Sequence, residues 1–413
     1  MRRNLGRPRR GRLQDREYFS VSADGLGEAP TVELLRRTIH LHLLSLGFAR
    51  NGDGYFIEGE LTKEKIRELH ANQRLERLRE SESFVAEYGL DLARHFASGG
   101  EVNPAAIEPE LVEVEANSLE SRLFRFACLL WSVPVSRGFG RRLRFLVRDR
   151  QNGRLIGLFA LGDPVFNLSA RDSWIGWTSE DRRERLVHVM DAYVVGAVPP
   201  YSHIIGGKLV AALATSAEVK SAYDRKYYGR EAVISKKKRH ARLALLTTTS
   251  ALGRSSIYNR LAIPGGPRFQ KIGATRGFGH FQLSGEIFDL LRRYLQAVEH
   301  PYASGHRFGM GPNWRLRVAR AALEAIGIRA NGVLRHGIER EVYAIPLVEN
   351  CREILKGSGE GIEFRVLPTE EIGDFCVRRW MVPRASWDER YRDVTRNGVL
   401  GDLLDGRIGS GIE

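Results

Sequence analysis

The densest cluster of polar and aromatic side chains in this sequence lies between positions 163 and 177. It contains Asp163, Arg171, Asp172, Trp174 and Trp177. Carboxylates beside arginine and tryptophan could hold a cationic amine in a catalytic site, or could order a loop. The two tryptophans, three residues apart, could instead stack on nucleobases. Alternatively, an Arg171–Asp172 pair anchors the loop while both indoles fill the core.

A second group of residues with possible chemistry follows position 334. His336 and Glu341 could act as a catalytic base and the group that orients it. Arg335 and Arg340 could instead bind phosphate, because a planar guanidinium matches the spacing of phosphate oxygens. A solvated, charged turn is the remaining interpretation. No stretch has the spacing of a known metal motif, so no metal site is predicted.

The chain is strongly basic, with 64 Lys and Arg against 50 Asp and Glu in 413 residues and a net charge of +14. Such an excess favours a polyanionic partner, of which nucleic acid is the most common. An Arg-rich solvated surface would give the same composition. The further candidate phosphate contacts are a compact basic run and one arginine of a predicted helix: Lys236, Lys237, Lys238, Arg239 and Arg315.

Hydrophobic periodicity divides the chain into five parts. The predicted parts are a disordered basic tail at 1–27, a helical N-terminal region at 28–118, an α/β core at 119–283, a C-terminal α+β extension at 284–385 and a flexible tail at 386–413. Within the core, two apolar runs around a Gln-Asn-Gly turn predict a hairpin. Alternating strands and helices in the second half of the core predict parallel crossovers.

The sequence also indicates a compartment. The three cysteines are far apart and lack C-x-x-C spacing, which speaks against disulfides and thiolate zinc sites. No apolar stretch reaches the roughly 18–20 residues that span a bilayer. The first residues are rich in arginine and lack the apolar middle of a secretory signal. We therefore expect a cytoplasmic protein without membrane association.

Several segments of the middle of the chain carry a family resemblance. They are GRRLRFLV at 140–147, LIG at 155–157, GDPV at 162–165, RDSWIGW at 171–177 and RHGIEREVY at 335–343. Together they resemble the DruA family of Druantia anti-phage defence proteins. The resemblance implies a bacterial antiviral role beside a large helicase-like partner. Stand-alone relatives and relatives near transposases leave a role in a mobile element open.

The order of elements expected over 143–283 is similar to that of GNAT acyltransferases. In that fold a hairpin precedes a splayed strand, and a helix N-terminus meets the pyrophosphate of coenzyme A. The matching stretch contains His203, Ile205, Gly206, Gly207 and Lys208. It departs from the GNAT pattern, because His203 replaces Gln or Arg and Lys208 replaces Gly or Ala. Acetyl-CoA is therefore a possible cofactor, and a glycine-rich turn without ligand is the alternative.

Tyr258 stands where the same resemblance implies a general acid that protonates the departing thiolate. A packed tyrosine with one hydrogen bond is the alternative. The predicted fold is α/β, a GNAT-like mixed sheet core flanked by a helical N-terminal region and a C-terminal α+β extension.

Three functions remain open at this point. The first is an anti-phage defence component that binds nucleic acid through a basic surface on a GNAT-like scaffold. The second is an active acyl-CoA-dependent N-acyltransferase. The third is an accessory DNA-binding protein of a mobile element. The departures in the coenzyme loop favour the first over the second.

Overall fold

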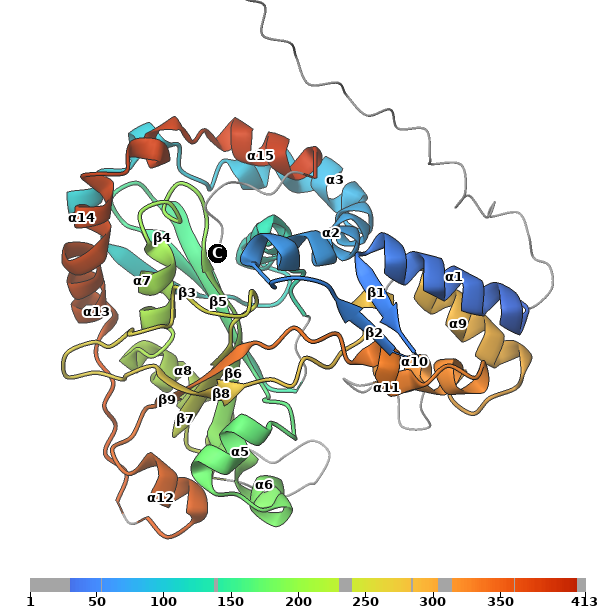
Figure 1. Cartoon of the computed structure of the whole chain (residues 1–413). Helices are drawn as coiled ribbons and strands as arrows, with labels where there is room; N and C mark the ends of the chain where they lie inside the picture. Colours follow the sequence, from blue (N-terminus) through green and yellow to red (C-terminus); the bar gives the residue numbers. More distant parts are fainter. Residues whose placement is uncertain are drawn as a thin grey trace, which may run out of the picture.

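The structure, a computed structural model, describes residues 30–52, 54–136, 140–229, 240–283, 285–303, 314–359 and 361–406. The expected basic tail at 1–27 and the basic run at 236–239 lie outside these residues. A seven-stranded mixed sheet with helices on both faces forms the larger part, and a helical lobe lies beside it (Figure 1). The predicted mixed α/β class is confirmed.

The sheet follows the order β3-β4-β5-β6-β7-β9-β8, and every neighbouring pair except β6–β7 is antiparallel. The predicted hairpin is confirmed as β4 and β5, with Gly153 at a positive φ of 71° in the connecting turn. The strands are β3 (Pro109–Glu113), β4 (Arg142–Asp149), β5 (Arg154–Gly162), β6 (Val189–Ala197), β7 (Leu245–Thr249), β8 (Gln270–Ala274) and β9 (Glu341–Pro346).

The sheet opens beside the second half of β6. Strand β6 pairs with β5 as far as Ala197, but pairs with β7 only over the three residues from Val189 to Asp191. Beyond Asp191, β7 continues as the antiparallel partner of β9. The sequence predicted several parallel crossovers, but among the described strands β6–β7 is the one parallel pair, because β8 and β9 pair antiparallel. The connection from β6 to β7 begins at this opening.

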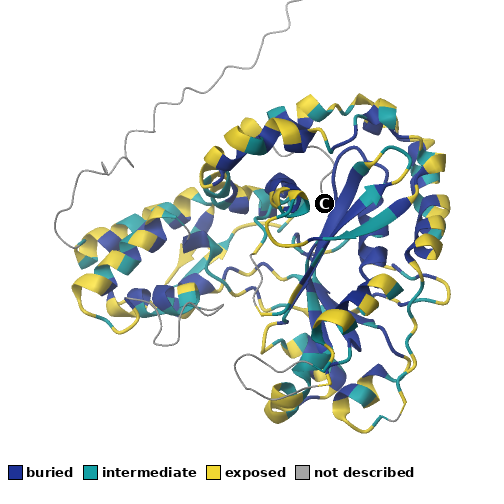
Figure 2. Cartoon of the chain, turned by 180° about the vertical axis from the view of Figure 1, so that it is seen from behind, coloured by how far each residue is buried: buried dark blue, intermediate teal, exposed yellow. Residues whose placement is uncertain are grey.

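Alternating side chains of the strands supply a core on each face of the sheet. On one face, Phe145 and Phe159 pack with helices α7 (Gly206–Leu213), α8 (Ala217–Tyr227) and α13 (Thr369–Cys376). On the other face, Leu146 and Leu158 pack with α3 (Glu82–Ala93), α4 (Leu119–Ala127) and α15 (Arg396–Leu404). Figure 2 shows the strands buried between these helices, whose outer sides are exposed.

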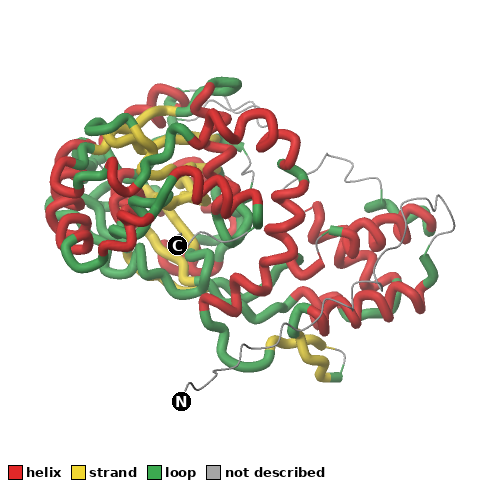
Figure 3. Tube along the Cα trace, turned by 90° about the horizontal axis from the view of Figure 1, so that it is seen from above, coloured by secondary structure: helices red, strands yellow, loops and turns green. Residues whose placement is uncertain are grey.

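The helical lobe is assembled from two distant parts of the sequence, as the colours of Figure 1 show, and Figure 3 shows its helices beside the part that contains the sheet. Its core joins Leu35 and Ile39 to Leu291 and Leu323. Thr31 caps the first helix of the lobe, since its hydroxyl accepts from the N–H of Leu34 at 3.3 Å. The lobe contains α1 (Val32–Ser45), the hairpin β1 (Phe48–Asn51) and β2 (Gly54–Ile57), α2 (Lys63–Arg79), α9 (Glu286–Ala297), α10 (Trp314–Ala325) and α11 (Ala330–Leu334).

Two segments differ from the sequence-based expectation. The sequence pattern of 256–261 predicts a short helix, but the structure has a series of turns there. Part of the expected flexible tail is ordered, because Val399, Leu400 and Leu403 of α15 are buried in the core on α3. The remaining helices are α5 (Ser169–Ile175), α6 (Ser179–Arg185), α12 (Cys351–Lys356) and α14 (Val382–Ala385), the last preceded by a π-helical turn at Val377–Met381. None of the described helices is both long and apolar enough to cross a bilayer.

Candidate ligand-binding cleft

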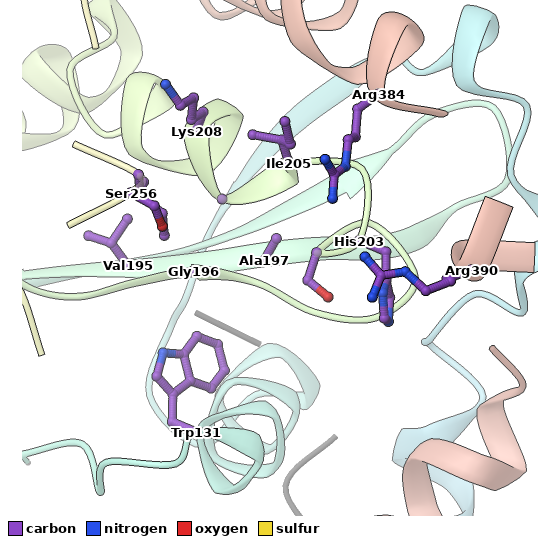
Figure 4. Close-up of a pocket in the computed structure, with 13 residues that line it drawn as sticks. Trp131, Val195, Gly196, Ala197, His203, Ile205, Lys208, Ser256, Arg384 and Arg390 are labelled. Carbon is purple, nitrogen blue, oxygen red and sulfur yellow. The ribbon is translucent and has the colours of Figure 1, made fainter. Parts of the chain in front are cut away.

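A cleft of about 360 Å³ lies where β6 separates from β7. Its floor is the end of β6, and the start of α7 and the turn after β7 form its sides (Figure 4). No carboxylate is among the described residues that line it. The lining residues are Trp131, Val195, Gly196, Ala197, Ser202, His203, Ile205, Gly207, Lys208, Ser256, Ile257, Arg384 and Arg390.

The glycines at the start of α7 are required by close contacts. A Cβ on Gly206 would come within 2.7 Å of the carbonyl oxygen of Tyr201, and one on Gly207 within 3.0 Å of Ile257. The preceding residue, Ile205, has a φ of 63°, a left-handed conformation that is unusual for a β-branched residue. The chain therefore turns tightly from β6 into α7, and the N–H groups of the first helical turn lie at the cleft.

Two arginines from the C-terminal part of the chain close one end of the cleft. Arg384 donates to the carboxylate of Asp388 at 2.8 Å, and Arg390 donates to both of its oxygens at 2.8 and 2.7 Å. The hydrogen bonds from Arg390 hold the pKa of Asp388 well below its usual range. Asp388 does not line the cleft itself. The carboxylate of Asp388 thus positions the guanidinium groups of Arg384 and Arg390 beside the cavity. Because two positive charges face one negative charge, the three side chains together carry a net positive charge.

His203 presents an unused polar group to the same end of the cleft. The residue is only 7% exposed, and its Nε2 has no hydrogen-bond partner among the described residues. The buried Oγ of Ser202 and Nε of Arg384 also have none there. Burial lowers the pKa of His203, and the charge of Arg390 adds to this shift. Buried polar atoms without partners are rare, and a bound ligand or water commonly satisfies them.

Lys208 marks the opposite rim. Its ammonium lies 5.1 Å from the ring centroid of Trp380, and in Figure 4 it points away from the middle of the cleft. Burial lowers the pKa of Lys208, and the charge of Arg379 adds to the shift. Its side chain therefore does not block the glycine turn.

The far wall of the cleft is apolar. Trp131 lies across β6 from α7 in Figure 4. A Cβ on Gly196 would come within 2.6 Å of its indole, so this glycine lets the ring pack on the strand. With Val195 and Ile257, the wall offers apolar surface next to the cationic end. The cleft is therefore suited to a ligand with an anionic part and an apolar part.

Tyr258 lies next to the cleft in sequence, but its side chain is packed elsewhere. Its ring is 7% exposed, stacks on Phe269 at 5.7 Å and meets Tyr343 edge-on at 5.4 Å. Ser256 and Ile257 line the cleft instead. This arrangement matches the packed-tyrosine alternative rather than a general acid directed at the cleft.

The cluster at 163–172 forms two separate ionic groups, because Asp163 pairs with Arg141 whereas Asp172 pairs with both Arg171 and Arg182. Asp163 accepts from Arg141 Nε at 2.7 Å. Arg171 is fully buried and donates twice to Asp172, and its other hydrogen bonds go to the backbone oxygens of Val165 and Phe166. The guanidinium of Arg171 is therefore occupied by partners within 165–172. Among the described residues, no group of three or more His, Cys, Asp or Glu is placed to hold a metal ion.

The two tryptophans of this cluster do not form an open stacking surface. Trp177 is 8% exposed, and its Nε1 donates to the carbonyl oxygen of Leu355 at 2.7 Å. Trp174 is half-buried, with the guanidinium of Arg352 5.7 Å from its ring centroid. The structure thus corrects the base-stacking interpretation for Trp177, because its indole fills the core and its polar atom is used there.

His336 and Glu341 have different partners, so the proposed base and orienter do not form a pair. His336 accepts from the N–H of Ile338, and burial lowers its pKa to about 3. Burial alone would raise the pKa of Glu341, but hydrogen bonds, foremost from Lys271, lower it to about 2. Ser255 N–H and the Tyr343 hydroxyl are its other donors.

The predicted nucleic-acid contacts are dispersed. Arg315 is exposed on α10, with its guanidinium 5.0 Å from the ring centroid of Phe288. Arg335 is exposed at the end of α11. Arg340 is half-buried and lies 3.1 Å from Nε2 of His70. The run Lys236, Lys237, Lys238 and Arg239 lies outside the described residues.

Sequence reasoning identified one wall of the cleft and missed the others. His203, Ile205, Gly207 and Lys208 line it as expected, and Gly206 supports the turn behind it. Arg384, Arg390 and Trp131 were not predicted, since they lie far away in the chain. For Arg384 and Arg390, one signal was present in the sequence, which is the richness of 378–392 in arginine and tryptophan.

Fold and cleft together define a basic α/β protein with a cation-lined cleft at the start of a helix. The sequence model of the family described as Druantia protein DruA matches residues 60–357. The chain is 47% identical over 359 residues to Druantia protein DruA of Escherichia coli (strain UMEA 4076-1), covering 87% of this chain and 89% of that protein. The chain belongs to the Druantia protein DruA family.

DruA proteins are components of the Druantia anti-phage defence system. No solved structure matches the chain. These comparisons do not support an acyltransferase identity for the core, so that interpretation stays a proposal.

Proposed function

We propose that this chain acts in Druantia-type anti-phage defence, and that its core binds a ligand of the coenzyme A class in the α7 cleft. Such a ligand combines a diphosphate with a long, weakly polar arm. The diphosphate would face His203, Arg384 and Arg390, and the arm would lie along the end of β6.

The buried, unpartnered Nε2 of His203 is the observation that carries this proposal. Leaving a buried polar group unpaired costs about 1–3 kcal/mol. A phosphate oxygen would satisfy it, and also the buried Nε of Arg384. The first turn of α7 adds N–H groups and the positive end of a helix dipole.

The order of elements gives further support. A hairpin, β4–β5, precedes β6, which separates from β7 before the glycine turn. This is the arrangement that the GNAT resemblance implied for a coenzyme A site. Because Tyr258 is packed against Phe269 and Tyr343 and does not line the cleft, we propose ligand binding rather than acyl transfer.

Thermal unfolding of the full chain with coenzyme A tests this proposal. A ligand that binds only the folded state stabilises it by about 2.7 kcal/mol at 100 times its Kd. We expect the Tm to rise by a few degrees with coenzyme A and with inorganic pyrophosphate, and not with pantetheine alone.

Substitutions then assign the binding to the cleft. The double variant Arg384→Gln/Arg390→Gln should lose the Tm shift, whereas Arg94→Gln should keep it, because Arg94 is exposed and does not line the cleft. No shift with either phosphate ligand would overturn the proposal. A shift that survives in the double variant would place the ligand elsewhere.

Nucleic-acid binding is a second proposal, favoured by the basic surface of α10. Arg315, Arg317 and Arg320 lie on this one helix, and Arg315 is exposed. Phosphate contacts release counterions, so the logarithm of the DNA affinity should fall with the logarithm of salt with a slope of about −0.9 per contact. Replacing all three by glutamine should reduce the slope by about 2–3. An unchanged slope would exclude α10 as the contact.

A further inference from the structure

Trp387 differs from the other tryptophans of the chain in its exposure. It is 69% exposed, whereas Trp131 and Trp177 are buried and the remaining three are half-buried. Exposing a large indole is unfavourable, since burying such a ring contributes substantially to stability. Burial in the core therefore does not explain this tryptophan.

Trp387 lies beside the α7 cleft. The guanidinium of Arg384, which lines the cleft, is 3.9 Å from the centroid of the Trp387 ring. Arg390 lines both the cleft and an open surface hollow of about 510 Å³ that includes Trp387. Asp388 binds both arginines. The indole is thus held on one face by a cleft arginine, while most of its surface faces solvent.

We propose that Trp387 is a base-stacking platform, so that the cleft takes a nucleoside phosphate. Its base lies on the indole, and its phosphates face His203, Arg384 and Arg390. Stacking on an aromatic ring suits any base, and Arg384 fixes the orientation of the indole before the ligand arrives. The inference rests on the phosphate site proposed above. It adds that the part of the ligand outside the phosphates is a nucleoside.

Calorimetric titration of the full chain with ADP and with inorganic pyrophosphate tests this inference. The wild type should bind ADP more tightly than pyrophosphate. Trp387→Ala should weaken ADP binding about 5- to 150-fold, the range expected for losing one base stack. It should leave pyrophosphate binding within about twofold, because the phosphate contacts remain. Trp387→Phe, which keeps a ring, should retain most of the ADP affinity.

A matched control is Phe166→Ala. Phe166 is another exposed ring with an arginine over it, Arg182 at 5.4 Å, but neither lines the cleft. This variant should bind both ligands as the wild type does. Equal affinities of the wild type for ADP and pyrophosphate, or ADP binding unaffected by Trp387→Ala, would overturn the inference while leaving the phosphate site intact. Failure of both ligands to bind would overturn both.

A third titrant separates two sources of the same chemistry. A 5′-phosphorylated tetradeoxyadenylate and ADP both carry a base and phosphate. Tighter binding of the oligonucleotide, lost in Trp387→Ala, would assign the site to the end of a nucleic acid. Tighter binding of ADP, lost in the same variant, would assign it to a free nucleotide. If Trp387 served only to dock another protein, Trp387→Ala would leave the affinities for all three ligands unchanged, and the inference would be overturned.

Discussion

Replacing His203 by alanine is the most informative perturbation of the cleft. The imidazole is 7% exposed and its Nε2 has no partner among the described residues, so no internal hydrogen bond of this atom is lost. A hydrogen bond from such a group to a charged phosphate contributes about 1.5–3 kcal/mol. We therefore expect His203→Ala to raise the Kd for pyrophosphate about 10- to 150-fold.

The same substitution should change the stability of the protein little. The alanine variant no longer buries an unpaired nitrogen, and it enlarges a cleft that already exists. We expect the free energy of unfolding to change by no more than about 1 kcal/mol, which differs from the loss of about 2–5 kcal/mol typical of a large-to-small change in a closed core.

Calorimetric titration and urea unfolding of the same preparations measure both quantities. His95→Ala is the matched control, because His95 is a half-buried histidine whose pKa is lowered as that of His203 is, but it does not line the cleft. It should bind pyrophosphate normally. A Kd for His203→Ala within twofold of the wild type would refute the assigned role, and a stability loss above about 3 kcal/mol would show that the histidine is a packing residue.

Three further predictions concern the turn and the buried charges. Gly206→Ala should destabilise the protein by about 1–3 kcal/mol, because its Cβ would lie 2.7 Å from the Tyr201 carbonyl oxygen. The same displacement of the turn should weaken pyrophosphate binding at least about tenfold in titration. Normal pyrophosphate binding by this variant would contradict the account of the turn. Arg171→Met removes the closer of the two cationic partners of Asp172 and leaves Arg182 at 3.1 Å, so it should cost about 1–3 kcal/mol in urea unfolding. A loss below about 0.5 kcal/mol, typical of a surface change, would argue against a stabilising Arg171–Asp172 pair. Since the pKa of Glu341 is lowered to about 2, its ionised form stabilises the fold above pH 4.5, and this contribution is lost as the pH falls towards 2. The free energy of unfolding of Glu341→Gln should therefore fall less steeply over that range than that of the wild type. Parallel pH profiles of the two proteins would disprove this role of Glu341.

Local elements were predictable from the sequence. The helical spacing of Leu35, Ile39 and Leu43 and the cap at Thr31 determine α1 without distant contacts. The turn at Gly153 likewise determines the β4–β5 hairpin. The glycine turn at the start of α7 was found for the same reason, since backbone that must approach a neighbour closely requires glycine at fixed positions.

Long-range assembly was not predictable. The expected core at 119–283 omits β3 and β9, although both belong to the sheet, because pairing partners far apart in the chain leave no local signal. Helix α1 packs with α9 in one lobe for the same reason. The cleft shows the consequence most clearly: Arg384 and Arg390 reach it from a segment that the sequence assigned to the end of an extension and to a flexible tail.

A crystal structure of the full chain with coenzyme A tests the central claim most directly. The account predicts the diphosphate within hydrogen-bond distance of Nε2 of His203 and beside Arg384 and Arg390, with the pantetheine arm along the end of β6. A well-ordered coenzyme bound elsewhere on the protein, with these side chains unmoved around an unoccupied cleft, would contradict it.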